Sequence, residues 1–137
     1  MKSSLLLILS LFAILASGLN VAPLAIGSSC SLFPDISNVQ LQVNPWPIIP
    51  ASPTSCILTG SLDKNETIGS VQVGQEYKST WTNNLITVNA FYAKGQTFTF
   101  NYNMNSPTQS GSYTEKFTVL QSSTSNNILC WQFSFSI

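Results

Sequence analysis

The sequence predicts an all-β protein, an immunoglobulin-like antiparallel β-sandwich of about seven strands. Three observations support this fold class. Apolar residues recur at every second position in several short runs, and these runs are rich in β-branched and aromatic residues. Turn-forming pairs such as Asn83-Asn84, Lys94-Gly95 and Ser110-Gly111 separate the runs at short intervals. After the N-terminal segment, no stretch has the period of about 3.6 residues that marks an amphipathic helix.

The first segment of the chain has the composition of a secretory signal peptide. Residues 1–18 contain a basic residue, Lys2, then an apolar run over residues 5–16, and small residues at Ala16 and Gly18. The run is too short to span a bilayer, and the C-terminus lacks the features of a glycolipid-anchor signal. We therefore expect a mature protein of one domain over residues 19–137, either secreted or in the lumen of endosomes or lysosomes.

The first strand is expected at residues 37–44, where Val39, Leu41 and Val43 alternate with polar residues. A segment with prolines at positions 45, 47, 50 and 53 follows. Because proline has no N–H to donate, this segment is not a central strand, and we expect it to cross between the two sheets. The remaining strands are expected at residues 54–62, 70–81, 85–92, 97–104, 113–121 and 128–137.

The apolar faces of the last three expected strands are strongly aromatic. In a small sandwich such side chains ordinarily fill the gap of about 10 Å between the sheets, so aromatic content alone predicts a core and not a pocket. The aromatic faces consist of Phe98, Phe100, Tyr102 and Met104 on one strand, Tyr113, Phe117 and Val119 on the next, and Trp131, Phe133 and Phe135 on the last.

Glu115 conflicts with this pattern, because it shares the apolar face of Tyr113 and Phe117. Two interpretations remain open at this point. Either the strand bulges at Glu115, or the carboxylate lies at a rim where it stays hydrated.

Charged residues are few and balanced, with five Lys and Arg together, five Asp and Glu together, and no His. The lack of a basic stripe argues against nucleic acid as a partner. Without His there is no Ser-His-Asp set or zinc site, and the chain has no glycine-rich phosphate loop. We therefore expect no enzyme activity, no catalytic residue, no metal and no cofactor. Asn65 begins the complete Asn-X-Thr sequon at residues 65–67, so we expect a glycan there.

Three cysteines, Cys30, Cys56 and Cys130, predict one disulfide and one free thiol in an oxidising compartment. Of the three pairings, Cys30 to Cys130 is favoured, because it ties a short N-terminal segment to the last strand and closes the longest loop. By loop-closure entropy, a loop of about 100 residues contributes about 4.7 kcal/mol. Cys56 lies in an expected strand and, without a His to activate it, is interpreted as a small buried apolar residue.

Several short motifs occur in a particular order along the chain. Cys30 is followed by "VQLQV" running into "NPWP", then by "LTGSL", "IGSVQV", "KGQTFTF", "SGSY" and finally "LCWQF". This order resembles the ML family of lipid-recognition domains, which includes a lysosomal cholesterol-transfer protein and a fungal phosphatidylglycerol/phosphatidylinositol transfer protein. The resemblance covers residues 30–137.

The resemblance implies two sheets that splay apart around an apolar cavity for a sterol or for the acyl chains of a phospholipid. It also implies a disulfide between Cys30 and Cys130, and it suggests a monomer that contacts membranes or a membrane receptor transiently. The same residues would form the core of a sandwich that binds nothing. The residues expected to line the cavity, from strand alternation, are Val71, Val73, Tyr77, Ile86, Val88, Ala90, Phe98, Phe100, Tyr102, Phe117, Val119, Trp131, Phe133 and Phe135.

A second interpretation of the sequence is a non-catalytic, extracellular immunoglobulin-like module that binds another protein or has a structural role. In this case the segment "PWPIIP", with Trp46, would be an exposed apolar contact.

Overall fold

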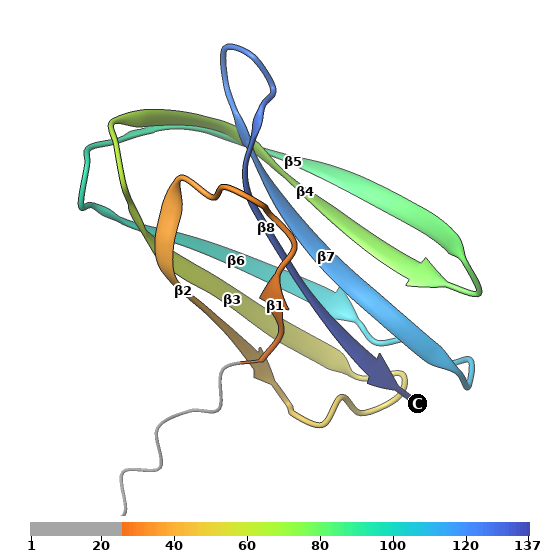
Figure 1. Ribbon diagram of the computed structural model, residues 1–137. Coiled ribbons are helices and arrows are strands. Elements are labelled where there is room, and N and C mark those ends of the chain that lie inside the picture. The colour runs from red at the N-terminus through yellow and green to blue at the C-terminus, as the bar shows by residue number, and fades with distance from the viewer. Residues whose placement is uncertain (1–25) are drawn as a thin grey trace, which may run out of the picture.

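The computed structural model describes residues 26–137, which form eight strands in two antiparallel sheets (Figure 1). The predicted all-β sandwich is confirmed. The expected signal peptide at residues 1–18 and the expected mature start at Leu19 lie outside the described residues. Among residues 26–137, no helix is long and apolar enough to cross a membrane. The strands are β1 (Ser28–Ser29), β2 (Ile36–Asn44), β3 (Pro53–Leu62), β4 (Glu66–Tyr77), β5 (Thr80–Tyr92), β6 (Thr97–Asn105), β7 (Ser112–Gln121) and β8 (Asn127–Ser136).

The two sheets differ in size. Strands β1, β8, β7, β4 and β5 form, in this order, a five-stranded sheet, and β2, β3 and β6 form a three-stranded sheet. Strands β5 and β6 follow each other in the sequence, but they are edge strands of different sheets and are not hydrogen-bonded to each other. Figure 1 shows that they separate along their length from the connection that joins them. On this side, strand pairing does not close the sandwich.

Aromatic rings from both sheets fill the centre of the core. Between ring centroids, Phe117 in β7 lies 6.3 Å from Phe100 and 6.0 Å from Tyr102, which both come from β6 in the opposite sheet. The ring of Phe133 in β8 is stacked beside Phe117 at 6.5 Å. At this level the rings occupy the gap between the sheets, as the aromatic content of the strands predicts.

The proline-rich segment over residues 45–52 connects β2 to β3 within one sheet, so the expectation that it crosses between sheets is wrong. The two strands are antiparallel neighbours, with Asn44 opposite Ser55 and Val43 opposite Cys56. The prolines keep the connection itself out of the ladder, but the alternating residues on either side pair directly with each other. The chain changes sheets at the β1–β2, β3–β4, β5–β6 and β6–β7 connections instead.

The hairpin of β4 and β5 turns at Lys78 and Ser79, which both have positive φ angles of 49° and 62°. The expectations of a strand over residues 70–81 and a turn at Asn83-Asn84 are therefore wrong. With the observed turn, Val71 lies opposite Ile86, and two apolar side chains share one face. A turn at Asn83-Asn84 would instead place Val71 opposite residue 96, beyond the Lys94-Gly95 turn that ends β5. The observed register forms a longer ladder that includes apolar pairs, and this pairing outweighs the local preference of Asn83-Asn84 for a turn.

Trp81 fixes the same register from the outer face of the sheet. Its ring covers Gly74 in β4, where an added Cβ atom would lie 3.2 Å from the ring. Lys116 in β7 places its ammonium group 4.2 Å from the centroid of this ring. The same Cβ atom would lie 2.6 Å from Oδ1 of Asn83, so a larger residue at position 74 would require both the Asn83 and the Trp81 side chains to shift.

The N-terminal segment is tied to the last strand. Cys30 and Cys130 form the disulfide that the spacing favours and the resemblance implies, across a sequence separation of 100 residues. The short strand β1, which the sequence analysis missed, pairs with β8 beside the disulfide, with Ser29 opposite Trp131. The indole N–H of Trp131 donates to the carbonyl of Ile26 at 2.9 Å. Cys56 is free and buried, as predicted.

Candidate functional site

A cleft opens between the two sheets where β5 and β6 separate. Its first part is a hollow of about 400 Å³. A second hollow of about 390 Å³ shares Gln75 and Thr82 with the first and continues under the connection between β6 and β7. We call these two adjoining hollows the cleft. The first is lined by Val73, Gln75, Thr82, Asn83, Asn84, Tyr102, Asn103, Met104, Asn105 and Glu115, and the second adds Tyr77, Thr80, Pro107, Thr108, Gln109 and Tyr113.

The inner face of the large sheet changes character along its length, and this change makes the cleft. Val71 and Ile86, deep in the sandwich, are apolar and oppose each other on β4 and β5. Two positions closer to the turn, Val73 lies opposite Asn84, and two further on, Gln75 lies opposite Thr82. Because directly opposed residues of an antiparallel pair share a face, these amides and this hydroxyl belong to the inner face. The cleft therefore has an apolar inner end and a polar opening.

Glu115 is the charged side chain of the cleft, and it is 2% exposed. Its carboxyl oxygen Oε2 accepts a hydrogen bond from Nε2 of Gln75, the residue opposite it on β4, at 3.1 Å. Strand β7 pairs without interruption on both sides at this position, so there is no bulge. Both interpretations left open by the sequence are thus wrong, because Glu115 is neither displaced by a bulge nor hydrated at a rim. It is held inside, with an amide as its partner.

Burial raises the pKa of Glu115 from its usual 4.5 to about 7, and the hydrogen bond from Gln75 partly opposes this rise. Two groups on the opposite sheet face it. Burial, and then the negative charge of Glu115, raise the pKa of the Tyr102 phenol and bring that of the Cys56 thiol to about 12. Below about pH 7, Glu115, Tyr102 and Cys56 are therefore all uncharged.

The chemistry of Cys56 agrees with its prediction as a buried apolar residue. A thiol with a pKa near 12 holds its proton at neutral pH and is therefore not an activated nucleophile. In the part of the chain that the structure describes, no three His, Cys, Asp or Glu side chains come together as a metal site would require.

The residues expected to line a cavity divide into two groups. Val73, Tyr77 and Tyr102 lie on the walls of the cleft. The others fill the space between the sheets, and their role as ligand contacts stays a prediction. Of these, Val71, Phe98, Phe100, Phe117, Val119, Phe133 and Phe135 are buried in the core, Ile86, Val88 and Trp131 are partly buried against it, and Ala90 is half-buried on β5.

Most of the polar lining, notably Gln75, Thr82 and Asn84, was not predicted from the sequence. The expected turn at Asn83-Asn84 removed the first residues of β5 from the sheet, so their inner positions were not considered. One signal was present in the sequence. A carboxylate among aromatic residues of the same strand face, as at Glu115, indicates either an irregular strand or a polar partner from the neighbouring strand.

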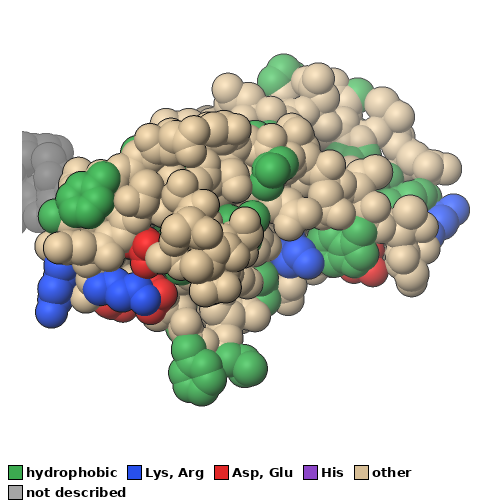
Figure 2. Space-filling model, turned by 90° about the horizontal axis from the view of Figure 1, so that it is seen from above, with side chains coloured by type: hydrophobic (Ala, Val, Ile, Leu, Met, Phe, Trp, Pro, Cys, Tyr) green, Lys and Arg blue, Asp and Glu red, His purple; other side chains and the backbone are tan. Residues whose placement is uncertain are grey.

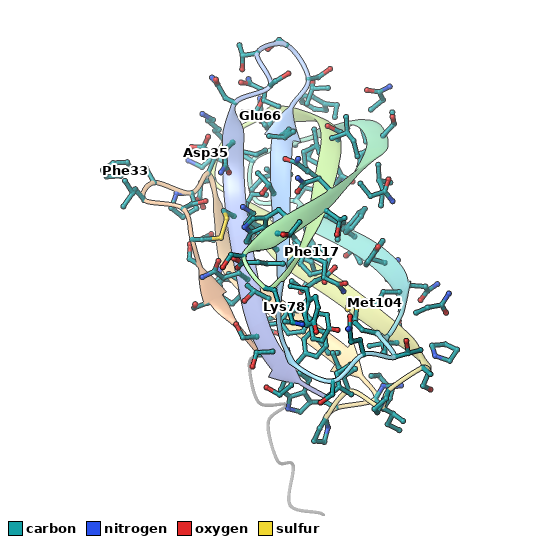
Figure 3. All side chains as sticks on the ribbon, turned by 90° about the vertical axis from the view of Figure 1, so that its right-hand side faces the viewer. Phe33, Asp35, Glu66, Lys78, Met104 and Phe117 are labelled. Atoms are coloured by element: carbon teal, nitrogen blue, oxygen red, sulfur yellow. A yellow bond between two sulfur atoms is a disulfide. The ribbon has the colours of Figure 1, made fainter. Side chains whose placement is uncertain are left out.

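The surface carries a small apolar protrusion away from the cleft. Leu32 and Phe33, both 90% exposed, lie in the loop between β1 and β2, and Phe33 points away from the body of the molecule (Figure 3). The disulfide of Cys30 holds one end of this loop, and a hydrogen bond from the N–H of Asp35 to the carbonyl of Ile128, at 2.8 Å, holds the other. On the face seen in Figure 2, hydrophobic side chains form separate small patches and charged groups are few.

Asn65, the expected glycan acceptor, is exposed in the turn between β3 and β4. Its Oδ1 accepts a hydrogen bond from the N–H of Lys94 at 2.9 Å. Glycosylation of Asn65 stays a prediction.

The fold is similar to that of a Niemann-Pick type C2 protein. A crystal structure of such a protein from the Japanese carpenter ant superposes with a TM-score of 0.61 over 82% of this chain and 98% of that chain, at 10% sequence identity. No protein-family profile and no curated protein sequence matches the chain. The likeness therefore establishes the ML-type fold, in agreement with the motif order.

Proposed function

We propose that this protein binds and transfers lipid, holding a sterol or the tail of a phospholipid between its two sheets. The observation that carries this proposal is the cleft between β5 and β6, whose walls include Val73 and Met104 of the hydrophobic core and Tyr102, which packs against it. Its size falls in the range of about 300–1,000 Å³ that is typical of small-molecule sites. The ML-type fold and the motif order support the same conclusion.

The energetics of the core favour an apolar guest. An empty apolar cavity costs about 24 cal/mol per Å³, so a sandwich without a ligand closes its interior with its own side chains. The rings of Phe100, Tyr102 and Phe117 do this here. A lipid tail contributes about 0.8 kcal/mol for each methylene removed from water and would replace those ring contacts. We expect Tyr102, half-buried on the cleft wall, to move when a tail enters.

We propose that lipid exchange involves a transient contact with a membrane through Leu32 and Phe33. Two adjacent apolar side chains, each 90% exposed, are too few for a stable protein interface, which buries about 800 Å² per partner. A bilayer accepts such side chains without a matching surface, and burial of each contributes about 1.5–3 kcal/mol. The protein is proposed to act as a non-catalytic monomer, secreted or in the endolysosomal lumen.

Native mass spectrometry of the full chain, expressed through a secretory pathway, tests the lipid proposal directly. The protein is mixed with vesicles that contain cholesterol, phosphatidylcholine and phosphatidylglycerol, and is then separated from them. We expect a mass increase that corresponds to one lipid molecule. Protein that stays free of every lipid class, and that also fails to take up a fluorescent sterol, would contradict the proposal.

A second candidate function is supported by the connection between β2 and β3. Trp46 and Ile49 are 42% and 52% exposed, and they lie on either side of the buried Ile48. This arrangement suits an apolar contact with another protein, as the second interpretation of the sequence requires.

A further inference from the structure

The polar opening of the cleft contains groups that recognise a particular kind of lipid head. The carboxyl group of Glu115 is 2% exposed and lies on the cleft wall with Gln75 as its side-chain partner. The hydrogen bond from Gln75 uses the oxygen Oε2. Among the described residues, no hydrogen-bond donor lies on Oε1, and a carboxyl oxygen has room for at least one. Since Glu115 lines the cleft, Oε1 is free to take part in a hydrogen bond with a ligand bound there.

The lining also restricts the charge of the ligand. In both hollows of the cleft, the polar side chains are amides, hydroxyls and the carboxyl of Glu115, and no Lys lines either of them. A phosphate head would lose water there without a cation to compensate, and it would lie near a second acidic group. An amine would have to form a buried ion pair, although burial already disfavours the charged form of Glu115.

We propose that the cleft binds the hydroxyl group of a neutral lipid, with Glu115 and Gln75 as its hydrogen-bonding partners. This inference rests on the proposed lipid-binding function and specifies the head group. A hydroxyl group can both donate a hydrogen bond to Glu115 or Gln75 and accept one from them. It also brings no charge into a cleft whose lining contains no Lys. The adjoining apolar walls, Val73 and Met104, lead from this polar pair toward the core, where the tail would lie.

Matched pairs of lipids that differ by the hydroxyl group test the inference. Cholesterol and its 3-deoxy analogue form one pair, and monooleoylglycerol and methyl oleate form the other. Each competes for the full-length protein against bound dehydroergosterol. Because one hydrogen bond to a buried partner changes affinity about tenfold, we expect the hydroxylated member of at least one pair to bind about ten times more tightly. Phosphatidylglycerol and octadecylamine should compete more weakly than that member.

The variant Glu115→Leu should reduce the preference within that pair to less than about twofold. To separate an effect on binding from an effect on stability, Glu115→Gln and Gln75→Leu are measured as well, together with the thermal unfolding of each variant. Glu115→Gln keeps a hydrogen-bonding group and should keep part of the preference. The control is Glu66→Leu, since Glu66 is also buried, at 5% exposure, but does not line the cleft. This control should keep the full preference.

The outcomes separate this inference from the proposed function. If lipids bind but neither pair shows a preference for its hydroxylated member, the inference is overturned and lipid binding stands. The same conclusion follows if the folded Glu115→Leu and Gln75→Leu variants both keep that preference. Tighter binding of octadecylamine or phosphatidylglycerol also overturns it. If no lipid binds at all, both the inference and the proposed function are wrong.

Discussion

Gln75 and Glu115 lie directly opposite each other on β4 and β7, and a hydrogen bond of 3.1 Å joins their side chains inside the sandwich. In most small sandwiches such a pair of inner positions is filled by aliphatic residues. Here the amide satisfies one oxygen of a carboxyl group that has little contact with water. The pair therefore links the stability of the protein to the ionisation of one side chain.

We predict that the protein becomes less stable as the pH rises from about 4.5 to above 7. Burial raises the pKa of Glu115 to about 7 in the folded state, whereas the usual value is 4.5, so between these values the folded state binds more protons than the unfolded state. The stabilisation is fully present below pH 4.5 and is lost as the pH rises through 7. The shift corresponds to at most about 3 kcal/mol. Urea unfolding at pH 5 and pH 8 measures it.

Glu115→Gln removes the titrating group, so this variant should lose most of the difference between pH 5 and pH 8. The control Glu76→Gln changes a half-buried glutamate next to Gln75 in sequence, on the opposite face of β4, and should leave the difference unchanged. Equal pH profiles for the wild type and Glu115→Gln would show that Glu115 does not titrate in this range.

The disulfide should contribute a large share of the stability. Cys30 and Cys130 are 100 residues apart, and closing a loop of this length contributes about 4.7 kcal/mol by chain entropy. We expect the variant with both cysteines changed to Ala to lose about 2–5 kcal/mol. Guanidinium unfolding, with and without a reductant, measures this loss.

The third cysteine provides the control for this experiment. A Cys56→Ala variant keeps the disulfide, so the reductant should lower its stability as much as it lowers that of the wild type. If the reductant leaves the wild type unchanged, the bond between Cys30 and Cys130 has no stabilising role.

The loop of Leu32 and Phe33 should determine binding to vesicles. Changing both residues to Ser removes two fully projecting apolar side chains, so we expect at least a tenfold loss of vesicle binding in a co-sedimentation assay. The unfolding temperature should change little, because both side chains are 90% exposed. Leu85→Ser, which changes a 62% exposed residue on the outer face of β5, is the matched control. A loss of the same size in this control would show that any exposed apolar residue contributes, and that the loop is not a membrane contact.

Trp46 distinguishes the two candidate functions. Its ring packs edge-on against Phe133, with 6.0 Å between the ring centroids, and 42% of the residue is exposed. If the protein transfers lipid, Trp46→Ala should leave lipid uptake within about twofold of the wild type. Loss of binding to an isolated protein partner, with lipid uptake absent in both forms, would instead favour the protein-binding module.

The fold was largely predictable because its main determinants are local. Alternation over "SNVQLQVN" and the later runs depends on which residues are apolar, and this is visible in the sequence. The short strand β1 was not predictable in the same way. Ser28 and Ser29 carry no alternation, and they are in a strand because the neighbouring disulfide and the hydrogen bond from Cys30 to the carbonyl of Cys130 hold them beside β8.

The candidate site was predictable only in part. Val73, Tyr77 and Tyr102 were identified from the period of their strands, and all three reach the cleft. Thr82 and Asn84 were not predicted, because the face of the sheet on which they lie depends on the position of the hairpin turn. The Asn83-Asn84 pair has a strong local preference for a turn, but the pairing of Val71 with Ile86 and the contact of Trp81 with Gly74 determine the register. Both pairs join residues across the hairpin, so the period of either strand alone does not reveal them.

The length of the turn at Lys78 and Ser79 determines which side chains of β5 face the cleft. Since side chains alternate between faces, a single-residue slip of β5 against β4 would exchange its inner and outer sets. Trp81 and Leu85 would then point between the sheets, and Thr82 and Asn84 would face the solvent. The same slip would turn Ile86 and Val88 away from the core, so the two-residue length of this exposed hairpin is required both for the polar entrance and for the packing behind it.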